Sequence, residues 1–277
     1  MVSTNTIVIA PEWQALLQAH GLNSVAAIYA YNGGTKDNSG KATELRRIEL
    51  SANGRTATLF VKKYWYPTSR LRWSGCYRGT FLGWSKVHRE FENLRRLRMW
   101  GLDAPAPVAY AEERRGRWLW RSVLISESVP EPVSLDLFIR DQRPDRAARR
   151  TLIDRLAEYT RRMHDHRFVH HDYFWRNILL SGGSLEHFYL IDSHKGRQWR
   201  WCGQTACAKD LATLDAPAPA FFRRSERLRF FLRYVGHDRL SVADKKLLRL
   251  TLRLAAPLRE PQLQRVRTAK TFAETKI

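Results

Sequence analysis

The stretch that decides the fold is His170-His171-Asp172-Tyr173-Phe174-Trp175-Arg176-Asn177, followed fifteen residues later by Asp192 in Tyr189-Leu190-Ile191-Asp192. A carboxylate, a carboxamide five residues on and a second carboxylate after a short apolar run suit metal-dependent phosphoryl transfer. Asp172 can accept the proton of an attacking hydroxyl, while oxygens of Asn177 and Asp192 can hold Mg²⁺ against phosphates. The pattern therefore predicts a phosphotransfer site built on these three residues.

The sequence around this stretch also predicts how two of its side chains converge. Residues 178–180 and 188–191 are short apolar runs typical of buried strands, and Ser181-Gly182-Gly183-Ser184 is typical of the turn between them. The resulting hairpin carries Asn177 and Asp192 to the same end of the strand pair.

A β-type run lies upstream, from Thr56 to Tyr64, and is rich in β-branched and aromatic residues. A lysine in such a strand can hold the α- and β-phosphates of a nucleotide, as in the kinase Val-Ala-Ile-Lys motif. Side chains alternate along a strand, so Lys62 and Lys63 lie on opposite faces. Alignment with the motif favours Lys62, and Lys63 is the competing residue.

That lysine is expected to pair with a glutamate on the next helix. A helix is predicted between Ser85, which can cap its start, and Gly101, which can end it. Glu90 borders the apolar stripe of this helix, whereas Glu92 falls among arginines. Glu90 is therefore the preferred partner of Lys62, and Glu92 is the alternative.

Together these residues resemble the lipopolysaccharide core kinases of the Kdo/WaaP family. The resemblance covers roughly residues 44 to 235 and is carried by Phe60-Val61-Lys62, Arg89-Glu90-Phe91, 101–110, 124–127, 170–180, 190–192 and 209–212. It implies an α+β, bilobal protein-kinase-like fold. Residues 1–128 would form an N-lobe with a small antiparallel sheet and one main helix, and residues 129–277 a mostly helical C-lobe.

The resemblance also implies an activity, the ATP-dependent phosphorylation of a heptose or Kdo hydroxyl in the lipopolysaccharide inner core, with Mg²⁺ as the metal. It assigns kinase roles by position to Lys62, Glu90, Asp172, Asn177 and Asp192. Residues 124–128 would be the hinge, where backbone groups of Glu127 and Ser128 receive the adenine. Rather than binding zinc, His170 is expected to brace the catalytic loop through hydrogen bonds, together with Asp210.

The chain departs from the kinase pattern in three places. No Gly-x-Gly-x-x-Gly precedes the lysine strand, and the nearest glycines lie in the polar segment 32–41, which has loop character, so the phosphate-covering loop is unassigned. Asp192-Ser193-His194 replaces Asp-Phe-Gly, and His171 replaces the arginine that normally precedes the catalytic Asp. We therefore expect an enzyme that is active without phosphorylation of an activation loop.

Composition limits the partners and the compartment. Lys and Arg total 48 against 27 acids, and the formal charge of +21 predicts a polyanionic partner such as a lipid-linked anionic saccharide. Three cysteines without framework spacing, and an N-terminus unlike a signal peptide, indicate a cytoplasmic protein. A peripheral place on the cytoplasmic face of the inner membrane is compatible with both. The basic tail from Arg259 is expected to be loosely ordered.

The segment 64–86 interleaves seven aromatic residues with cations, a mixture that suits a membrane interface. We interpret it as a contact for the lipid-linked acceptor or for the anionic inner leaflet. The competing interpretation is that these aromatic side chains simply pack on the small lobe.

Two other functions remain open at the level of sequence. The same fold could phosphorylate a protein or another small molecule, because only the acceptor separates these enzymes. A basic, non-catalytic binding protein would share the charge, but the retained Lys62, Asp172, Asn177 and Asp192 argue against it. No nucleic-acid-binding motif accompanies the charge, so nucleic acid is not expected as a partner. The sequence leaves the oligomeric state open.

Overall fold

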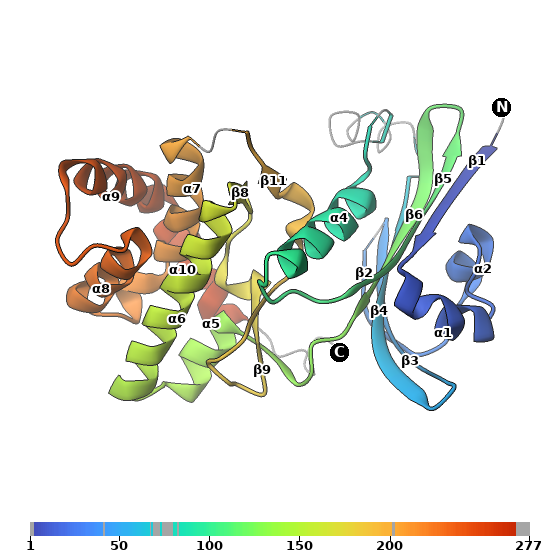
Figure 1. Cartoon of the computed structure of the whole chain (residues 1–277), viewed down its shortest axis with the longest axis horizontal. Helices are drawn as coiled ribbons and strands as arrows, with labels where there is room; N and C mark the ends of the chain where they lie inside the picture. The colour runs from blue at the N-terminus through green and yellow to red at the C-terminus, as the bar shows by residue number, and fades with distance from the viewer. Residues whose placement is uncertain are drawn as a thin grey trace. The chain divides into compact units, whose positions relative to one another are not determined.

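The computed structural model describes residues 3–40, 42–66, 68, 73, 80–81, 83–200 and 203–269. These residues divide into two compact units (Figure 1). The first consists of described residues within 1–96 and 105–128, and the second of those within 97–104 and 129–271. Helix α4 (Lys86–Met99) contributes residues to both units, because the boundary falls after Arg96.

In the first unit, the described residues form a six-stranded antiparallel sheet in the order β1-β5-β6-β4-β3-β2. The strands are β1 (Ser3–Ile9), β2 (Thr35–Gly40), β3 (Thr43–Ala52), β4 (Arg55–Trp65), β5 (Pro107–Arg115) and β6 (Trp118–Glu127). The predicted lysine strand is β4, in the interior of the sheet. The polar segment 32–41 was predicted to be a loop, but most of it forms the edge strand β2, whose backbone pairs with β3.

A tight turn sets the register of β3 against β4. Asn53 and Gly54 both have positive φ, 53° and 75°, and they separate the paired residues Ala52 and Arg55. Two such residues favour a type I′ hairpin turn, whose twist matches that of the strands. In this register Lys62 lies opposite Leu45 on one side and Leu124 on the other.

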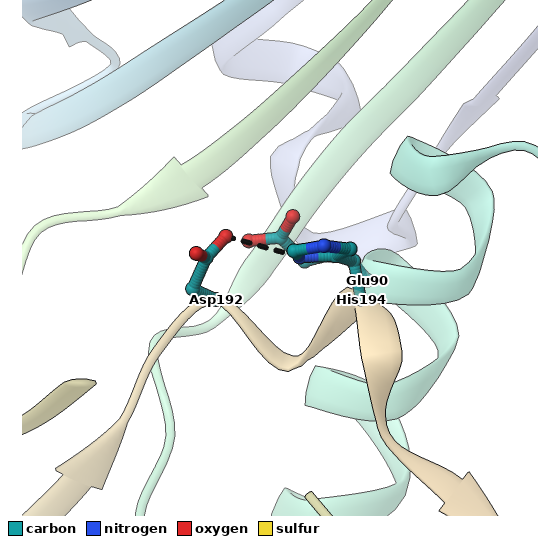
Figure 2. A group of neighbouring side chains, drawn as sticks. All are labelled: Glu90, Asp192 and His194. Carbon is teal, nitrogen blue, oxygen red and sulfur yellow. Dashed lines mark hydrogen bonds and ion pairs between the residues drawn. The ribbon is translucent and has the colours of Figure 1, made fainter. Parts of the chain in front are cut away.

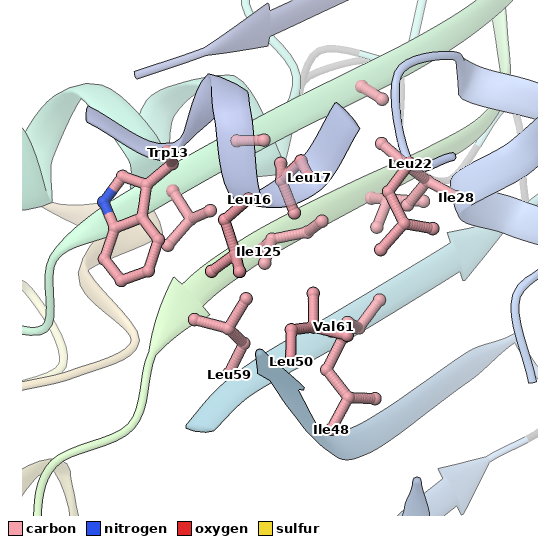
Figure 3. Packing of buried hydrophobic residues seen from close by; sticks show 14 of the residues in the cluster. Trp13, Leu16, Leu17, Leu22, Ile28, Ile48, Leu50, Leu59, Val61 and Ile125 are labelled. Carbon is pink, nitrogen blue, oxygen red and sulfur yellow. The ribbon is translucent and has the colours of Figure 1, made fainter. Parts of the chain in front are cut away.

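Helices cover both faces of this sheet (Figures 1 and 3). On one face, a 3₁₀ turn (Pro11–Trp13), α1 (Gln14–Ala19) and α2 (Val25–Ala30) pack on Leu59, Val61 and Ile125. On the other face, Val87 and Phe91 of α4 pack against residues of β4, β5 and β6. Ser85 begins α4 as predicted, since its Oγ accepts the N–H of His88 at 3.2 Å.

The second unit combines short strands with helices. Its strands are β7 (Pro132–Ser134), β8 (Phe168–Val169), β9 (Ile178–Ser181), β10 (Phe188–Leu190) and β11 (Arg197–Gln198). Its α-helices are α5 (Leu135–Leu137), α6 (Arg146–Asp165), α7 (Gln204–Asp215), α8 (Arg224–Val235), α9 (Val242–Ala255) and α10 (Arg259–Thr268). A π-helical turn follows α5 (Phe138–Gln142), and 3₁₀ turns occupy Trp175–Asn177, Ser193–Lys195, Ala218–Ala220 and Ala256–Leu258.

A shared core joins the helices of this unit. Ala157 of α6, Leu211 of α7 and Phe231 of α8 are buried together, and Leu247 and Leu248 of α9 pack against them. Capping side chains start two of these helices, since Asp145 accepts the N–H of Ala148 and Ser241 that of Asp244. Within the described residues, none of the helices has the length and apolar content needed to span a bilayer.

The expectation of a loose tail after Arg259 is wrong for the described part of that segment, which forms α10. The guanidinium of Arg140 donates hydrogen bonds to the carbonyls of Val266, Arg267 and Ala269 at the end of this helix. Val266 is also buried. A basic, weakly amphipathic segment is thus ordered by a distant side chain, which binds the carbonyl groups that a helix end leaves unpaired.

Candidate active site

In the first unit, the structure pairs Lys62 with Glu90. The Lys62 Nζ lies 3.5 Å from Glu90 Oε1, and Glu90 is only 4% exposed. The competing glutamate, Glu92, instead binds Arg95 at 2.8 Å on the solvent side of α4. The pair fits the predicted alternation, because Lys62 lies on the face of β4 that α4 covers.

The competing lysine, Lys63, has a structural role. It is 3% exposed and donates to the carbonyls of Tyr29 at 2.9 Å and Tyr31 at 2.7 Å. Its Nζ also lies 3.6 Å from Glu44. Burial lowers the pKa of Lys63, and the Glu44 carboxylate opposes that effect. These contacts tie the end of α2 to the sheet, so Lys63 is not the residue that faces α4.

The adenine contacts expected at Glu127 and Ser128 stay a prediction, but the structure shows where the backbone N–H groups of these residues go. The N–H of Glu127 donates to the carbonyl of Ala106 at 2.9 Å, and that of Ser128 to the carbonyl of Thr58 at 2.8 Å. Both amide donors are thus engaged within the protein. A nucleotide contact on this stretch would have to use other backbone groups, or replace these hydrogen bonds.

In the second unit, Asp210 of α7 holds the loop that was predicted to be catalytic. Its carboxylate accepts the N–H of His170 at 2.7 Å and that of His171 at 2.9 Å, and Asp210 is 1% exposed. His171 has a φ of 61°, a strained conformation for a residue with a side chain. The two charge-assisted hydrogen bonds stabilise this backbone, which leads directly into Asp172. The expected bracing role of Asp210 is confirmed.

His170 connects the loop to the segment that carries Asp192. The fully buried ring places Nε2 3.2 Å from the carbonyl of Ile191. Burial lowers the pKa of His170 despite the nearby carboxylates of Asp210 and Asp172, so the ring is neutral at pH 7. Contact with a carbonyl requires the tautomer that carries its proton on Nε2. His170 therefore braces the loop by hydrogen bonding, as predicted.

The β9–β10 hairpin brings Asn177 and Asp192 to the same end, as predicted. Ile178 pairs with Leu190, and the N–H of Ile191 donates to the carbonyl of Asn177 at 3.0 Å. The Asn177 Nδ2 donates to the backbone carbonyl of Asp172 at 2.8 Å. This hydrogen bond fixes the amide, so that Oδ1 is its atom left for a metal.

Asp192 adopts a left-handed backbone, with φ 57° and ψ 38°. Its Oδ1 lies 3.1 Å from Nδ1 of His194, as Figure 2 shows. Ser193, at the position of the usual phenylalanine, is completely buried. Asn177 and Asp192 offer hard oxygen ligands, the kind that Mg²⁺ prefers over the imidazole nitrogen of His194.

Two cations that were not predicted from the sequence lie beside the predicted base. The Lys195 Nζ lies 3.2 Å from Asp172 Oδ1, and Arg176 Nη2 lies 4.0 Å from the same oxygen. The guanidinium of Arg176 also lies over the ring of Phe174, 4.3 Å from its centroid. Arg176 falls inside the quoted motif and could have been noticed there. Lys195 reaches Asp172 only through the turn after Asp192.

Comparisons with known proteins show the family of the chain. A family model described as the lipopolysaccharide kinase (Kdo/WaaP) family matches residues 34–228. A 3-deoxy-D-manno-octulosonic acid kinase of Vibrio cholerae serotype O1 is 29% identical over 127 residues, 43% of this chain and 51% of that protein. The chain therefore matches about half the length of this curated relative.

A solved structure, described as WaaP in complex with acyl carrier protein, is similar over almost the whole chain. The TM-score is 0.64 at 22% identity, and the match covers 94% of this chain and 99% of the other. The fold is thus α+β and protein-kinase-like, which confirms the fold class predicted from the sequence.

The bracing carboxylate yields the first prediction. In Asp210→Asn an NH₂ group must face one of the two backbone N–H donors, which leaves a buried polar group unsatisfied. We expect the free energy of unfolding to fall by about 1–3 kcal/mol. Urea denaturation with a spectroscopic probe in the second unit measures the loss.

The matched control is Asp165→Asn. Asp165 makes a 3.7 Å ion pair with Arg161 and is 68% exposed, so its loss should change stability by roughly 0–1 kcal/mol. Equal stability of the two variants would contradict the bracing role of Asp210.

Proposed function

Because the chain belongs to the lipopolysaccharide kinase (Kdo/WaaP) family, we propose that it transfers the γ-phosphoryl group of ATP to a heptose or Kdo hydroxyl of the inner core. One observation beyond the family match carries the proposal. A braced loop presents Asp172, and a hairpin brings Asn177 and Asp192 together at its base. This is the arrangement that metal-dependent phosphoryl transfer requires.

The proposed roles follow from the chemistry of each group. Asp172 accepts the proton of the acceptor hydroxyl as its oxygen attacks the γ-phosphorus. Lys62, oriented by Glu90, binds the α- and β-phosphates and neutralises part of their charge. Residues 124–128 contact the adenine through backbone groups, with the N–H groups of Glu127 and Ser128 remaining in their internal hydrogen bonds.

The metal ligands in this proposal are Asn177 and Asp192. The fixed amide of Asn177 leaves Oδ1 available, and one face of Asp192 is accessible, with 32% of its side chain exposed. Mg²⁺ held there would neutralise charge on the phosphates and orient them for in-line displacement. Two ligands are sufficient, since Mg²⁺ takes its other ligands from water and phosphate.

The second prediction concerns the base. Asp172→Asn keeps the size of the side chain but cannot accept the hydroxyl proton as a carboxylate does. We expect kcat to fall by about 10²–10⁴ while the affinity for Mg-ATP stays unchanged. Transfer of labelled phosphate from ATP to purified inner-core acceptors, together with equilibrium nucleotide binding, measures both quantities.

Asp192→Asn serves as the companion variant, because it should lose Mg²⁺-dependent nucleotide binding as well as turnover. Wild-type turnover in Asp172→Asn would refute the assignment of the base. Mass spectrometry of lipid A–core from cells with and without the gene identifies the sugar, since one phosphate should be missing. A protein or other small-molecule acceptor would leave that spectrum unchanged, and a basic non-catalytic protein would show no transfer to any acceptor.

The proposal includes a site of action on the cytoplasmic face of the inner membrane. In the described part of the segment 64–86, Trp73 is 67% exposed and Trp84 is 48% exposed. Both rings also pack on other residues of the first unit. The ring centroid of Trp73 lies 5.2 Å from that of Trp118, and the Trp84 ring stacks on His88 with 4.4 Å between the centroids. The Arg96 guanidinium also lies over the Trp84 ring, 5.9 Å from its centroid, so each ring combines packing contacts with exposed surface that can meet a headgroup region. The cations Arg70, Arg72 and Arg78 lie outside the described residues.

The third prediction tests this contact. The double variant Trp73→Ala/Trp84→Ala should bind anionic vesicles more weakly than wild type, because interfacial affinity scales with the aromatic area inserted. Vesicle sedimentation measures the bound fraction, with Trp199→Ala as control, since Trp199 is 42% exposed in the second unit. Undiminished binding of the double variant would remove the membrane role of this segment.

A protein partner is proposed on the likeness to WaaP solved with acyl carrier protein. A cavity of about 590 Å³ in the second unit is lined by leucines and phenylalanines of α6, α7 and α8, with Arg224, Arg227 and Arg259 among its residues. An apolar cavity of this size suits a ligand-sized apolar group. Arg227 is paired with Asp215 at 2.7 Å, so Arg224, Arg259 and the net charge of +21 are what would attract an acidic partner.

The fourth prediction is that an acylated acyl carrier protein binds this chain more tightly than the unacylated form. Each methylene of the acyl chain that becomes buried in the cavity adds about 0.8 kcal/mol to the binding free energy. Two buried methylenes therefore already raise the affinity roughly tenfold. Calorimetry measures the affinity of both carrier forms for the wild type and for two variants. Leu228→Glu changes an exposed residue that lines the cavity, and Val242→Glu changes an exposed apolar residue elsewhere. Only Leu228→Glu should weaken the acylated complex, and equal binding of both carrier forms would overturn the proposal.

A further inference from the structure

The carboxylate of Asp172 has a cationic neighbour to which the kinase motifs assign no function. Lys195 contributes its Nζ at 3.2 Å from Asp172 Oδ1. The lysine side chain is 51% exposed, whereas that of Asp172 is 11% exposed. A half-exposed ion pair contributes only about 0–1 kcal/mol to stability. Stability therefore gives little reason for a lysine at this position.

The backbone of Lys195 is held firmly although its side chain is exposed. It ends the 3₁₀ turn that follows the left-handed residue Asp192, and the N–H of Gly196 closes this turn on the carbonyl of Ser193 at 2.8 Å. A Cβ at position 196 would clash with the ring of Phe168, so the turn packs directly against β8. The next residue, Arg197, pairs with Val169 in the β8–β11 ladder.

The fixed backbone defines where the Lys195 side chain begins, and its flexible four-carbon stem lets the ammonium group occupy several positions around that point. Asp172 is proposed to bind the acceptor hydroxyl, whose oxygen attacks the γ-phosphorus. The transferred group must therefore pass close to the carboxylate that Lys195 already contacts. A rotation of the half-exposed stem would let its three N–H donors leave the carboxylate for a phosphoryl oxygen that approaches Asp172.

Arg176 is less suited to the same task. Its nearest nitrogen is 4.0 Å from Asp172, and its guanidinium lies on the ring of Phe174. A stacked, half-buried guanidinium supplies a fixed positive charge near the base. It lacks the freedom to follow a moving phosphoryl group.

On these grounds, and resting on the proposed kinase function, we propose that Lys195 is a catalytic residue that moves from the Asp172 carboxylate to the transferred phosphoryl group. The acceptor O–H gives its proton to Asp172, a bond forms between the acceptor oxygen and the γ-phosphorus, and the bond from that phosphorus to the bridging oxygen of ADP breaks. Lys195 keeps all its protons and donates hydrogen bonds to the equatorial oxygens. It stabilises charge where it develops, the main contribution of proteins to this chemistry.

The fifth prediction compares Lys195→Met, which keeps length without charge, with Lys195→Arg, which keeps the charge. Loss of one such donor typically lowers kcat by about 10²–10³, and we expect that loss in the Met variant. The Arg variant should recover most of the activity. The KM for the acceptor and the Kd for Mg-ATP should stay close to wild type in both. Lys246→Met, on the exposed side of α9, is the control.

If Lys195 had only a structural role, its substitution would lower the melting temperature or weaken nucleotide binding without a selective loss in kcat. Equal kcat values for Lys195→Met and Lys246→Met would overturn the proposal. Hydrolysis of ATP without acceptor is measured in parallel, because water then takes the place of the hydroxyl. Absence of transfer to any inner-core acceptor by the wild type would refute the proposed acceptor. The hydrolysis rates of wild type and Lys195→Met would still decide the role of Lys195.

Discussion

A single buried carboxylate, that of Asp210, sets the geometry on which the candidate site depends. Burying a charge is unfavourable unless hydrogen bonds compensate for the lost water. Here the backbone N–H groups of His170 and His171 provide that compensation, and in return the carboxylate stabilises the left-handed conformation of His171. These two hydrogen bonds therefore determine the direction in which the chain enters Asp172. The proposed base is thus positioned by the backbone before it, while its carboxylate contacts Lys195.

Most of what the sequence predicted correctly depends on residues close together in the chain. The alternation along Thr56–Tyr64 predicted β4 and the faces of its two lysines, because strand geometry is local. The capping residue Ser85 and the apolar stripe after it predicted α4, and hence Glu90 beside Lys62. The hairpin at 178–191 was predictable from two short apolar runs and a glycine turn. In each case the local preference and the tertiary contacts favour the same structure.

What the sequence did not predict depends on partners that are far apart in the chain. Strand β2 forms from a polar segment because β3 offers it a backbone to pair with, which composition cannot indicate. Helix α10 is ordered by Arg140, more than a hundred residues earlier. The N–H groups of Glu127 and Ser128 are occupied by carbonyls of Ala106 and Thr58. Lys195 reaches Asp172 only because Asp192 adopts a left-handed backbone, and no spacing rule encodes that turn.

The buried position of Lys63 has a consequence for how the sheet forms. Sliding β4 by one residue would exchange the faces of its side chains, bringing Lys62 among the leucines under α1 and exposing Leu59 and Val61 to the opposite side. The slipped pairing would also remove Lys63 from the carbonyls of Tyr29 and Tyr31. The two carbonyl groups that bind the Lys63 ammonium therefore favour the register in which Lys62 faces α4.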